Sequence, residues 1–319
     1  MILCVAASPS VDKLFEVDRL AHGEIHRPLH FLQVPGGKGL NVARAVSVLE
    51  ESVVATGLLA GHVGEWVRQS LDAEGVEGRF AWTAGETRSS LSVADRATGG
   101  LTEFYEAGSS ITAEEWRGFE AVVRDLVRHA TWLSLSGSLP AGAPQGGYAA
   151  LVEAAHAAGA WVAVDARGEP LAQAIEASPE LVKINVAEAE ELLGRVISGV
   201  EQITAAAAEI RRRAGGEGHA AVVTMGAEGV VLIEPGGHAW RGRLHVRGRY
   251  PVGSGDAFLA GLLVGLARGG SWHQAVCLAL GAATANAQEP GAGRLDPERA
   301  LKLAADVDLV ALEEQEISS

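Results

Sequence analysis

The chain has 319 residues, of which 48% are hydrophobic and 21% charged, so it is long and apolar enough to bury a large core. Its formal net charge of −14 argues against nucleic acids and anionic membranes as partners, because both require a basic surface. The two cysteines, Cys4 and Cys277, lie in apolar stretches and predict neither a disulfide framework nor a metal cluster. No signal peptide is recognisable and no apolar run approaches about 18 residues, so we expect a cytoplasmic protein.

Short apolar strands alternate with helical segments along most of the chain, a pattern typical of a mostly parallel sheet covered by helices on both faces. Helices are expected over residues 40–50, 64–75 and 257–267. Strands are expected over residues 1–7, 52–60, 131–137, 161–167 and 180–186, followed by the strand pair 219–226 and 229–234. We therefore predict an α/β fold over residues 1–319, either as one large domain or as one domain with an appendage.

Two stretches, residues 13–33 and 79–106, depart from this rhythm. Polar and apolar side chains roughly alternate in both, with turn residues between, which is typical of half-exposed antiparallel strands. We expect them to combine into a small second sheet, a lid that excludes water from a ligand site on the main sheet.

The stretch PVGSGDAFLAGLLVGLA, residues 251–267, places Asp256 between a glycine-rich turn and an apolar run. Such a run predicts a buried helix, so polar chemistry is confined to its first turn. The free amides of Gly253, Ser254 and Gly255, together with the helix dipole, could bind an anion beside Asp256. An ordinary N-cap explains the aspartate equally well, although not the glycine on each side of Ser254.

A second glycine cluster, PGGKGLNVARA at residues 35–45, also leads into a helix. It matches neither the phosphate-loop motif nor the dinucleotide motif, and a simple turn before a helix is the alternative. Lys38 and Asn41 are three residues apart and would face the same way, while Gly37 would allow close backbone contact with a ligand. Asp12 follows the first strand, where it is either a ligand contact or a turn-capping residue.

Two further strands end in polar residues. Asn185 and Glu188 are three apart at a junction of strand and helix, which suits a ligand site and also a helix capping box. Thr224, Gly226 and Gly229 form either a nucleotide-binding turn or a hairpin turn. Glycine-rich turns, a lysine and carboxylate or amide groups at the ends of successive strands together favour a polar ligand site.

These residues carry a family resemblance. GGKGLNVARA and PVGSGDAFLAGLLVGL resemble the two signature motifs of the ribokinase-like (PfkB-type) carbohydrate kinases. LSGSLPAGAP, VDARGEPL, LVKINVAEAEELLG, VVTMGAEGVVLI and PGAGRLDPE resemble its hexose-phosphate branch, which contains 1-phosphofructokinase and tagatose-6-phosphate kinase. The resemblance implies a ribokinase-like three-layer fold in a single domain, residues 1–319, with a small β-sheet lid formed by the two stretches 13–33 and 79–106.

The resemblance also implies ATP-dependent phosphorylation of a sugar hydroxyl. Asp256 would accept the hydroxyl proton, and the amides of Gly253, Ser254 and Gly255 would stabilise the moving phosphoryl group. Magnesium would lie near Asn185 and Glu188 and contact them through water, since this ion prefers oxygen ligands and retains waters. Nucleotide-binding positions correspond to Thr224, Gly226, Gly229 and Asn286. A monovalent cation such as K⁺ near PGAGR and a homodimer formed through the lid are further implications.

On the acceptor side, the sugar-contacting positions of the family correspond to Asp12, Gly37, Lys38, Asn41 and Ser138. Arg27, Arg88 and Lys38 would clamp the phosphate of a sugar phosphate, unless the two arginines are simply solvated lid residues. The chain departs from the family at Ser8, where asparagine is usual, at Ser254, where alanine is common, and in the lid strand near residues 89–106.

We therefore predict a kinase that acts on a ketohexose phosphate, with fructose 1-phosphate as the leading acceptor and tagatose 6-phosphate or fructose 6-phosphate as alternatives. A catalytically silent sugar- or nucleotide-binding regulator is the rival of a different class. The presence of Asp256, its flanking glycines and the Asn185–Glu188 pair argues against that rival, because a pure binder needs no base.

Overall fold

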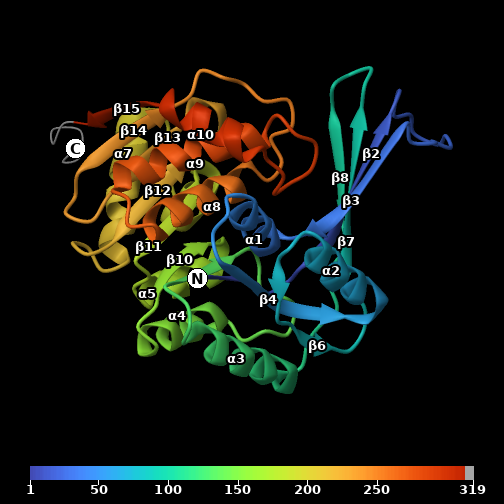
Figure 1. Ribbon diagram of the computed structural model, residues 1–319, viewed down its shortest axis with the longest axis horizontal. Helices are drawn as coiled ribbons and strands as arrows, with labels where there is room; N and C mark the ends of the chain where they lie inside the picture. The colour runs from blue at the N-terminus through green and yellow to red at the C-terminus, as the bar shows by residue number, and fades with distance from the viewer. Residues whose placement is uncertain (313–319) are drawn as a thin grey trace.

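A sheet of eleven strands forms the centre of the computed structural model, which describes residues 1–312 (Figure 1). The strand order is β15-β14-β13-β12-β11-β10-β9-β1-β4-β5, and β6 also pairs with β4. The strands are β1 (Ile2–Ala6), β4 (Val53–Ala60), β5 (Glu77–Gly78), β6 (Ala81–Thr83), β9 (Trp132–Ser136), β10 (Trp161–Asp165), β11 (Leu181–Asn185), β12 (Ala220–Thr224), β13 (Val230–Ile233), β14 (Ala239–Arg243) and β15 (Asp308–Leu312).

In the part of the sheet ordered β12-β11-β10-β9-β1-β4-β5, all neighbouring strands are parallel. Strands β13, β14 and β15 extend the sheet beyond β12, and each is antiparallel to its neighbour. The parallel part brings the carboxyl ends of β1, β9, β10, β11 and β12 to one edge of the sheet. This edge is where open α/β sheets bind ligands. The predicted mostly parallel sheet and its closing strand pair are confirmed.

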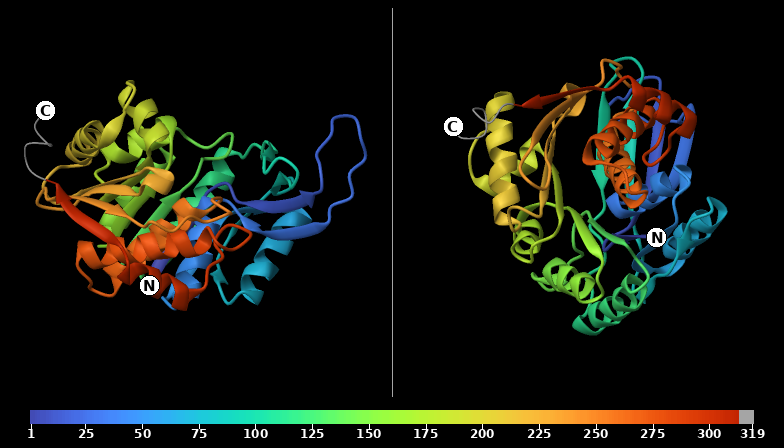
Figure 2. Two further views of the ribbon diagram at one scale, coloured as in Figure 1. Left: turned by 90° about the horizontal axis from the view of Figure 1, so that it is seen from above. Right: turned by 60° about the vertical axis from the view of Figure 1, so that its left-hand side comes forward.

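Helices cover both faces of the sheet, which gives the three layers visible in Figure 2. Alternate residues of β1 explain why both faces are apolar: Ile2, Cys4 and Ala6 join one core cluster, and Leu3 and Val5 join the other. The first cluster is covered by α1 (Lys38–Val48), α2 (Gly61–Ala73), α8 (Ser254–Ala267), α9 (Trp272–Asn286) and α10 (Pro297–Ala305); the second by α3 (Ala113–Val127), α4 (Gly147–Ala157), α5 (Gly168–Glu176), α6 (Val186–Leu193) and α7 (Gly199–Arg213).

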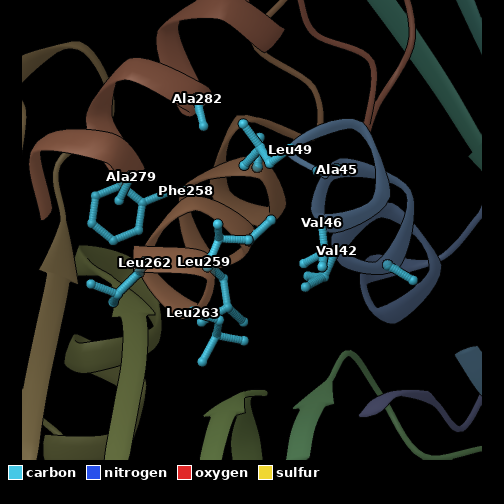
Figure 3. Close-up of a cluster of buried hydrophobic side chains, with 14 of the residues drawn as sticks. Val42, Ala45, Val46, Leu49, Phe258, Leu259, Leu262, Leu263, Ala279 and Ala282 are labelled. Atoms are coloured by element: carbon cyan, nitrogen blue, oxygen red, sulfur yellow. The ribbon is translucent and has the colours of Figure 1, made fainter. Parts of the chain in front are cut away.

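Helix α8 is the buried helix that the apolar run predicted. It packs between α1 and α9, where Phe258, Leu259, Leu262 and Leu263 are at most 2% exposed (Figure 3). Because these side chains are held rigidly by the core, the first turn of α8 has a fixed position at the sheet edge.

A separate four-stranded sheet projects from the main body and forms the lid (Figure 1). Its order is β3-β2-β7-β8, from β2 (Ser10–Val17), β3 (His30–Gly36), β7 (Arg88–Asp95) and β8 (Leu101–Tyr105). The two predicted stretches do combine, but their details were partly wrong. Residues 81–83 belong to the main sheet as β6, residues 18–29 connect β2 to β3 without a strand, and β2 pairs with β7 in parallel.

Two other predictions can be compared with the structure. Cys4 is buried and Cys277 half-buried, and both are unpaired thiols. Within residues 1–312, no helix is both long and apolar enough to span a membrane. The single-domain boundary at residue 319 falls outside the described residues.

Candidate active site

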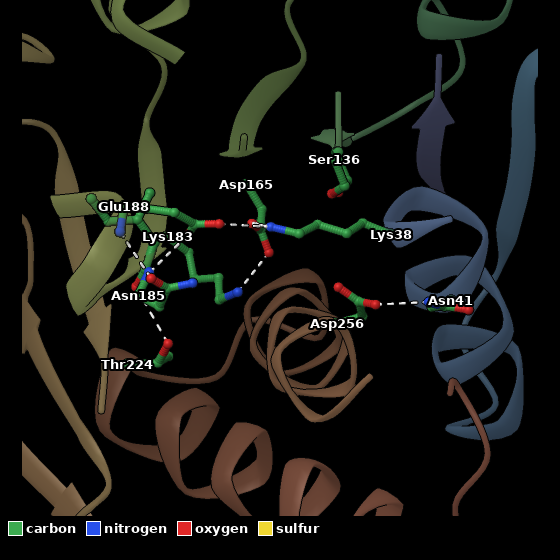
Figure 4. A network of polar contacts seen from close by, with 12 residues as sticks. Lys38, Asn41, Ser136, Asp165, Lys183, Asn185, Glu188, Thr224 and Asp256 are labelled. Atoms are coloured by element: carbon green, nitrogen blue, oxygen red, sulfur yellow. Dashed lines mark hydrogen bonds and ion pairs between the residues drawn. The ribbon is translucent and has the colours of Figure 1, made fainter. Parts of the chain in front are cut away.

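The first turn of α8 holds a buried carboxylate. Helix α8 begins at Ser254, after Gly253 in a left-handed conformation (φ 80°), and Asp256 is only 6% exposed. Its Oδ2 atom accepts a hydrogen bond of 2.8 Å from the Nδ2 atom of Asn41 on α1 (Figure 4). The buried Oδ1 atom of Asn41 has no partner among the described residues. The carboxylate and amide predicted from two distant motifs are therefore in direct contact.

The surroundings of Asp256 make it a stronger base than an ordinary aspartate. Burial is the largest cause, and the nearby negative charge of Asp165 adds to it; together they raise the pKa of Asp256 to about 7. Lys183, the hydrogen bond from Asn41 and Lys38 act in the opposite direction. A carboxyl group with a pKa near neutrality is suited to accept a proton at physiological pH.

The amides at the start of α8 are only partly free. The N–H of Ser254 donates to the carbonyl of Pro251 at 3.2 Å, because the chain makes a tight turn there. The N–H groups of Gly253 and Gly255 donate to no other residue within 1–312. Of the three amides predicted to bind an anion, the two glycine amides therefore remain available.

Two lysines and two carboxylates form an ion-pair network beside Asp256 (Figure 4). The Nζ atom of Lys38 lies 2.7 Å from Oδ1 of Asp165 and 3.0 Å from Oε1 of Glu188. The Nζ atom of Lys183 lies 2.6 Å from Oδ2 of Asp165. Lys38 thus forms ion pairs with Asp165 at the carboxyl end of β10 and with Glu188 in the first turn of α6. Both pairs lie next to the first turn of α8.

Asp12 belongs to lid strand β2 and reaches back to the glycine cluster before α1. Its carboxylate accepts a 2.7 Å hydrogen bond from Oγ of Ser10 and a hydrogen bond from the backbone of Gly37. Gly36 leaves room for this carboxylate, because a Cβ atom there would lie 2.1 Å from Cγ of Asp12. Burial raises the pKa of Asp12, while Ser10 and the charge of Arg88 lower it. Asp12 is therefore neither exposed nor a turn cap.

Of the two arginines predicted to clamp a phosphate, only Arg88 lies near Asp12. Arg88, at the start of β7, lies close enough to Asp12 to influence its pKa, and donates to the carbonyl of Ser8 at 3.1 Å. Its buried Nε atom has no partner within the described residues. Arg27 lies beyond the far end of the lid, since Ser10 pairs with Arg88 while Glu16 pairs with His30. Six strand residues span roughly 20 Å, so Arg27 does not join Arg88.

Ser138 is exposed in the loop after β9. The preceding Gly137 faces the Lys38 side chain, since a Cβ atom at Gly137 would lie 3.6 Å from Cβ of Lys38. The structure therefore brings the Ser138 loop to the same side of the sheet as the lysine, but it gives the hydroxyl no described partner.

The predicted nucleotide-binding residues separate into two groups. Thr224 and Gly226, together with Asn185 of the predicted metal pair, line a cavity of about 500 Å³ that is also bounded by the start of α7 and by Arg241. Asn286 instead lies behind the first turn of α8, where its Nδ2 atom donates to the carbonyl of Val252 at 3.0 Å. Gly229 closes the turn η1 (Gly226–Glu228) with φ 98°, so the hairpin interpretation accounts for it fully.

Asn185 and Glu188 form the capping box that was the alternative interpretation of this pair. Oδ1 of Asn185 accepts from the Glu188 amide and Oε2 of Glu188 accepts from the Asn185 amide, both at 2.9 Å. Their oxygen atoms are a donor set that Mg²⁺ accepts, particularly through retained waters. Since Glu188 also binds Lys38, the capping box holds this carboxylate toward the network rather than away from it.

Asp165 and Lys183 are the site residues that the sequence analysis missed. Asp165 has no exposed surface and Lys183 is 4% exposed, so each requires a partner of opposite charge. A signal was present: both are charged residues in otherwise apolar strands, WVAVD and LVKIN. Their pairing depends on β10 lying beside β11, which the sequence pattern does not specify.

Comparison with known proteins places this geometry in a family. Residues 4–299 match the model of the pfkB family of carbohydrate kinases. The chain is 26% identical to Escherichia coli phosphofructokinase-2 in complex with fructose-6-phosphate, covering 95% of this chain and 98% of that one with a TM-score of 0.85. A possible 1-phosphofructokinase from Thermotoga maritima is 22% identical, with coverage of 98% and 100% and a TM-score of 0.88.

The fold is also shared with more distant kinases. Arabidopsis thaliana ribokinase, solved with ribose and ATP, is 21% identical over 95% of this chain and 98% of that one, with a TM-score of 0.75. This likeness confirms the ribokinase-like fold that the two signature motifs implied. With a family match over nearly the whole sequence, the chain belongs to the PfkB family of carbohydrate kinases.

Proposed function

We propose that this kinase transfers the γ-phosphoryl group of ATP to a hydroxyl of a ketohexose phosphate, with fructose 1-phosphate as the leading acceptor. The observation that carries the proposal is the buried Asp256 carboxylate in the first turn of α8, hydrogen-bonded to Asn41 and flanked by the Lys38 network. A buried carboxylate with its pKa raised to about 7 is typical of catalytic sites, which favours a kinase over a silent binding protein.

In the proposed reaction, the acceptor hydroxyl lies between Asp256 and the nucleotide. Asp256 takes the hydroxyl proton as the oxygen attacks the γ-phosphorus, and the bond to the leaving ADP oxygen breaks. The free amides of Gly253 and Gly255 and the ammonium of Lys38 stabilise the negative charge of the transferring group. The Nδ2 atom of Asn41 orients Asp256 by donating a hydrogen bond to it. The Oδ1 atom of Asn41 is available to accept a hydrogen bond from a hydroxyl of the acceptor sugar.

PfkB kinases use ATP with Mg²⁺, which neutralises phosphate charge during transfer. In this chain Asn185 and Glu188 would contact the ion through water, while Thr224 and Gly226 would hold the nucleotide in the adjacent cavity. One E. coli phosphofructokinase-2 structure contains potassium. We propose an equivalent monovalent cation near residues 290–294, a loop that Arg44 holds by donating to the carbonyl of Ala292 at 2.7 Å.

Fructose 6-phosphate is the second candidate acceptor, and a specific comparison favours it. The E. coli phosphofructokinase-2 crystallised with fructose-6-phosphate is 26% identical to this chain. Arg88 beside Asp12 supports a phosphorylated acceptor of either kind, because its Nε atom is buried without a described partner.

A coupled assay of ADP release tests the proposed function. The panel contains fructose 1-phosphate, fructose 6-phosphate, tagatose 6-phosphate and the corresponding free sugars, each with ATP and Mg²⁺. We expect the highest kcat/KM on a ketohexose phosphate. No turnover on any member, with sugar binding retained, would instead establish a silent binding protein.

Replacement of Arg88 tests how the acceptor phosphate is recognised. Arg88→Ala should lower kcat/KM for the phosphorylated acceptor by about 100-fold, since a two-pronged arginine–phosphate contact is lost. The corresponding unphosphorylated sugar should lose less than threefold. Arg96→Ala is the matched control on the same lid: Arg96 follows the other end of β7, where it pairs with Glu16 at 3.1 Å, and its loss should change neither value. Equal losses on both acceptors would contradict a phosphate contact at Arg88.

The raised pKa of Asp256 predicts where activity declines with pH. Proton acceptance requires the ionised form, so kcat/KM should fall tenfold per pH unit as the pH drops below about 7. The profile is obtained by measuring kcat/KM between pH 5 and 9, with the same range of acceptor concentrations at each pH. Activity that stays constant down to pH 5 would contradict a catalytic base with a pKa near 7.

We further propose a homodimer formed through the lid. Large apolar side chains are exposed on its strands and connecting loop: Ile25, Leu29, Phe31, Leu101, Phe104 and Tyr105. Exposed apolar surface of this kind is typical of protein–protein contacts. The E. coli relative has a tetrameric inhibited form, which supports association through some face. Sedimentation of the wild type and of Phe31→Asp should give a dimer and a monomer respectively.

A further inference from the structure

A buried ion pair lies at the centre of the site, and the steps assigned above do not use it. Both oxygens of the Asp165 carboxylate are occupied by ammonium groups, Oδ1 by Lys38 at 2.7 Å and Oδ2 by Lys183 at 2.6 Å. Asp165 has no exposed surface, and Lys183 is 4% exposed. Removing two charges from water is unfavourable, and apolar residues of similar volume often stabilise a fold as well or better.

The position of the pair points to a role in the reaction geometry. Asp165 ends β10 and Lys183 is the middle residue of β11, so both side chains are fixed by central, parallel strands. The Nζ atom of Lys183 lies 3.1 Å from where a Cβ atom on Gly255 would be, directly against the first turn of α8. The other side of Asp165 holds Lys38, the first residue of α1.

The pair thus connects the starts of two helices. α1 supplies Lys38 and Asn41 from the acceptor side, and α8 supplies Asp256 and the free glycine amides. Other charged or titratable groups near Asp165 are Asp256, whose pKa its negative charge raises, and Glu188, through Lys38. The buried Tyr148 hydroxyl of α4 is also nearby and donates to the carbonyl of Gly137 at 3.2 Å. No other side chain within residues 1–312 bonds to the Asp165 carboxylate.

We propose that the Asp165–Lys183 pair is a positioning device: it fixes the Lys38 ammonium and the first turn of α8 relative to each other for phosphoryl transfer. The inference rests on the proposed kinase activity. Small misplacements at a reacting centre reduce turnover by about 100-fold, so the pair should affect kcat much more than substrate binding. In this role Asp165 and Lys183 act through Lys38 and α8, in addition to the opposing effects of their charges on the pKa of Asp256.

Three variants separate positioning from simple charge balance. Asp165→Asn and Lys183→Met each leave one buried charge unpaired, so both should lower the unfolding temperature and kcat. The double variant Asp165→Asn/Lys183→Met removes both charges and should recover most of the unfolding temperature. We expect its kcat nevertheless to stay at least 100-fold below wild type, with KM for ATP and for the acceptor changed less than fivefold.

The double variant decides the question even if the single variants do not fold. Recovery of kcat to within threefold of wild type would overturn the inference, because the pair would then serve only to balance charge. A loss expressed wholly in KM would also overturn it. Glu180→Gln is the matched control: Glu180 accepts from the Val162 amide at the opposite end of β10 and should leave kcat unchanged. A wild-type protein without kinase activity would remove the proposed function itself, which is a separate outcome.

Discussion

Asp256→Asn should reduce turnover by about 10² to 10⁴, because the reaction loses the group that accepts the acceptor proton. Asparagine has nearly the same shape and can still accept from Nδ2 of Asn41 through its own oxygen, so the site geometry is kept. Affinity for ATP should therefore change less than a few fold. Steady-state kinetics and nucleotide titration of the purified variant measure both quantities.

Loss of stability would not explain such a result. The pKa of Asp256 is raised from 3.8 to about 7 in the folded state, so the folded protein binds this proton more tightly than the unfolded chain does. The contribution of Asp256 to stability is consequently greatest below about pH 4 and declines as the pH rises through about 7. At pH 8 the neutral asparagine should therefore be tolerated at least as well as the charged aspartate.

A matched control removes a carboxylate at the start of another helix. Asp296 caps α10 by accepting from the Arg299 amide at 3.1 Å, and asparagine is an equally good N-cap. Asp296→Asn should leave turnover unchanged. If Asp256→Asn also retained wild-type turnover, proton acceptance by this residue would be excluded.

Gly253→Ala should have the second largest effect on activity. Gly253 has a left-handed backbone, and an added Cβ atom would lie 2.4 Å from Cβ of Ala292, so the turn before α8 must shift. A displacement of the free amides by about 1 Å is expected to reduce kcat by about 100-fold. The strained backbone should also lower the free energy of unfolding by about 1 to 3 kcal/mol. Kinetics and denaturant unfolding measure the two effects.

Gly269 provides the control for this substitution. It follows the opposite end of α8 with φ 76°, and no atom lies within 4 Å of its potential Cβ atom. Gly269→Ala therefore introduces comparable backbone strain without a collision, and should reduce stability while leaving kcat intact. Similar kcat losses in both variants would mean that helix stability, rather than amide position, limits turnover.

Much of the fold could be predicted because hydrophobic periodicity reports directly on burial. The uncharged run after Asp256 specified a buried helix, and the apolar strands specified a sheet covered on both faces. The lid was predicted less well. Alternating residues near 81–83 suit an edge strand of either sheet, and pairing with β4 is decided by tertiary packing.

The candidate site was predictable where residues lie close in sequence, as at residues 36–41 and 253–256. Contacts that depend on strand order were not predictable. Asp165 meets Lys183 only because β10 and β11 are neighbours, and Arg27 is remote from Arg88 only because of the lid register. The Asn185–Glu188 spacing could not distinguish a capping box from an ion site, since both uses need the same side chains on the first helical turn.

The central claim is that Asp256 deprotonates an acceptor hydroxyl held between α1 and α8. A crystal structure with a non-hydrolysable ATP analogue, Mg²⁺ and the sugar phosphate selected by the assay tests it most directly. We predict that one acceptor hydroxyl oxygen lies about 2.6 to 3.2 Å from the Asp256 carboxylate, with the γ-phosphorus on its other side. An acceptor bound with all its hydroxyl groups out of reach of Asp256 would contradict this account.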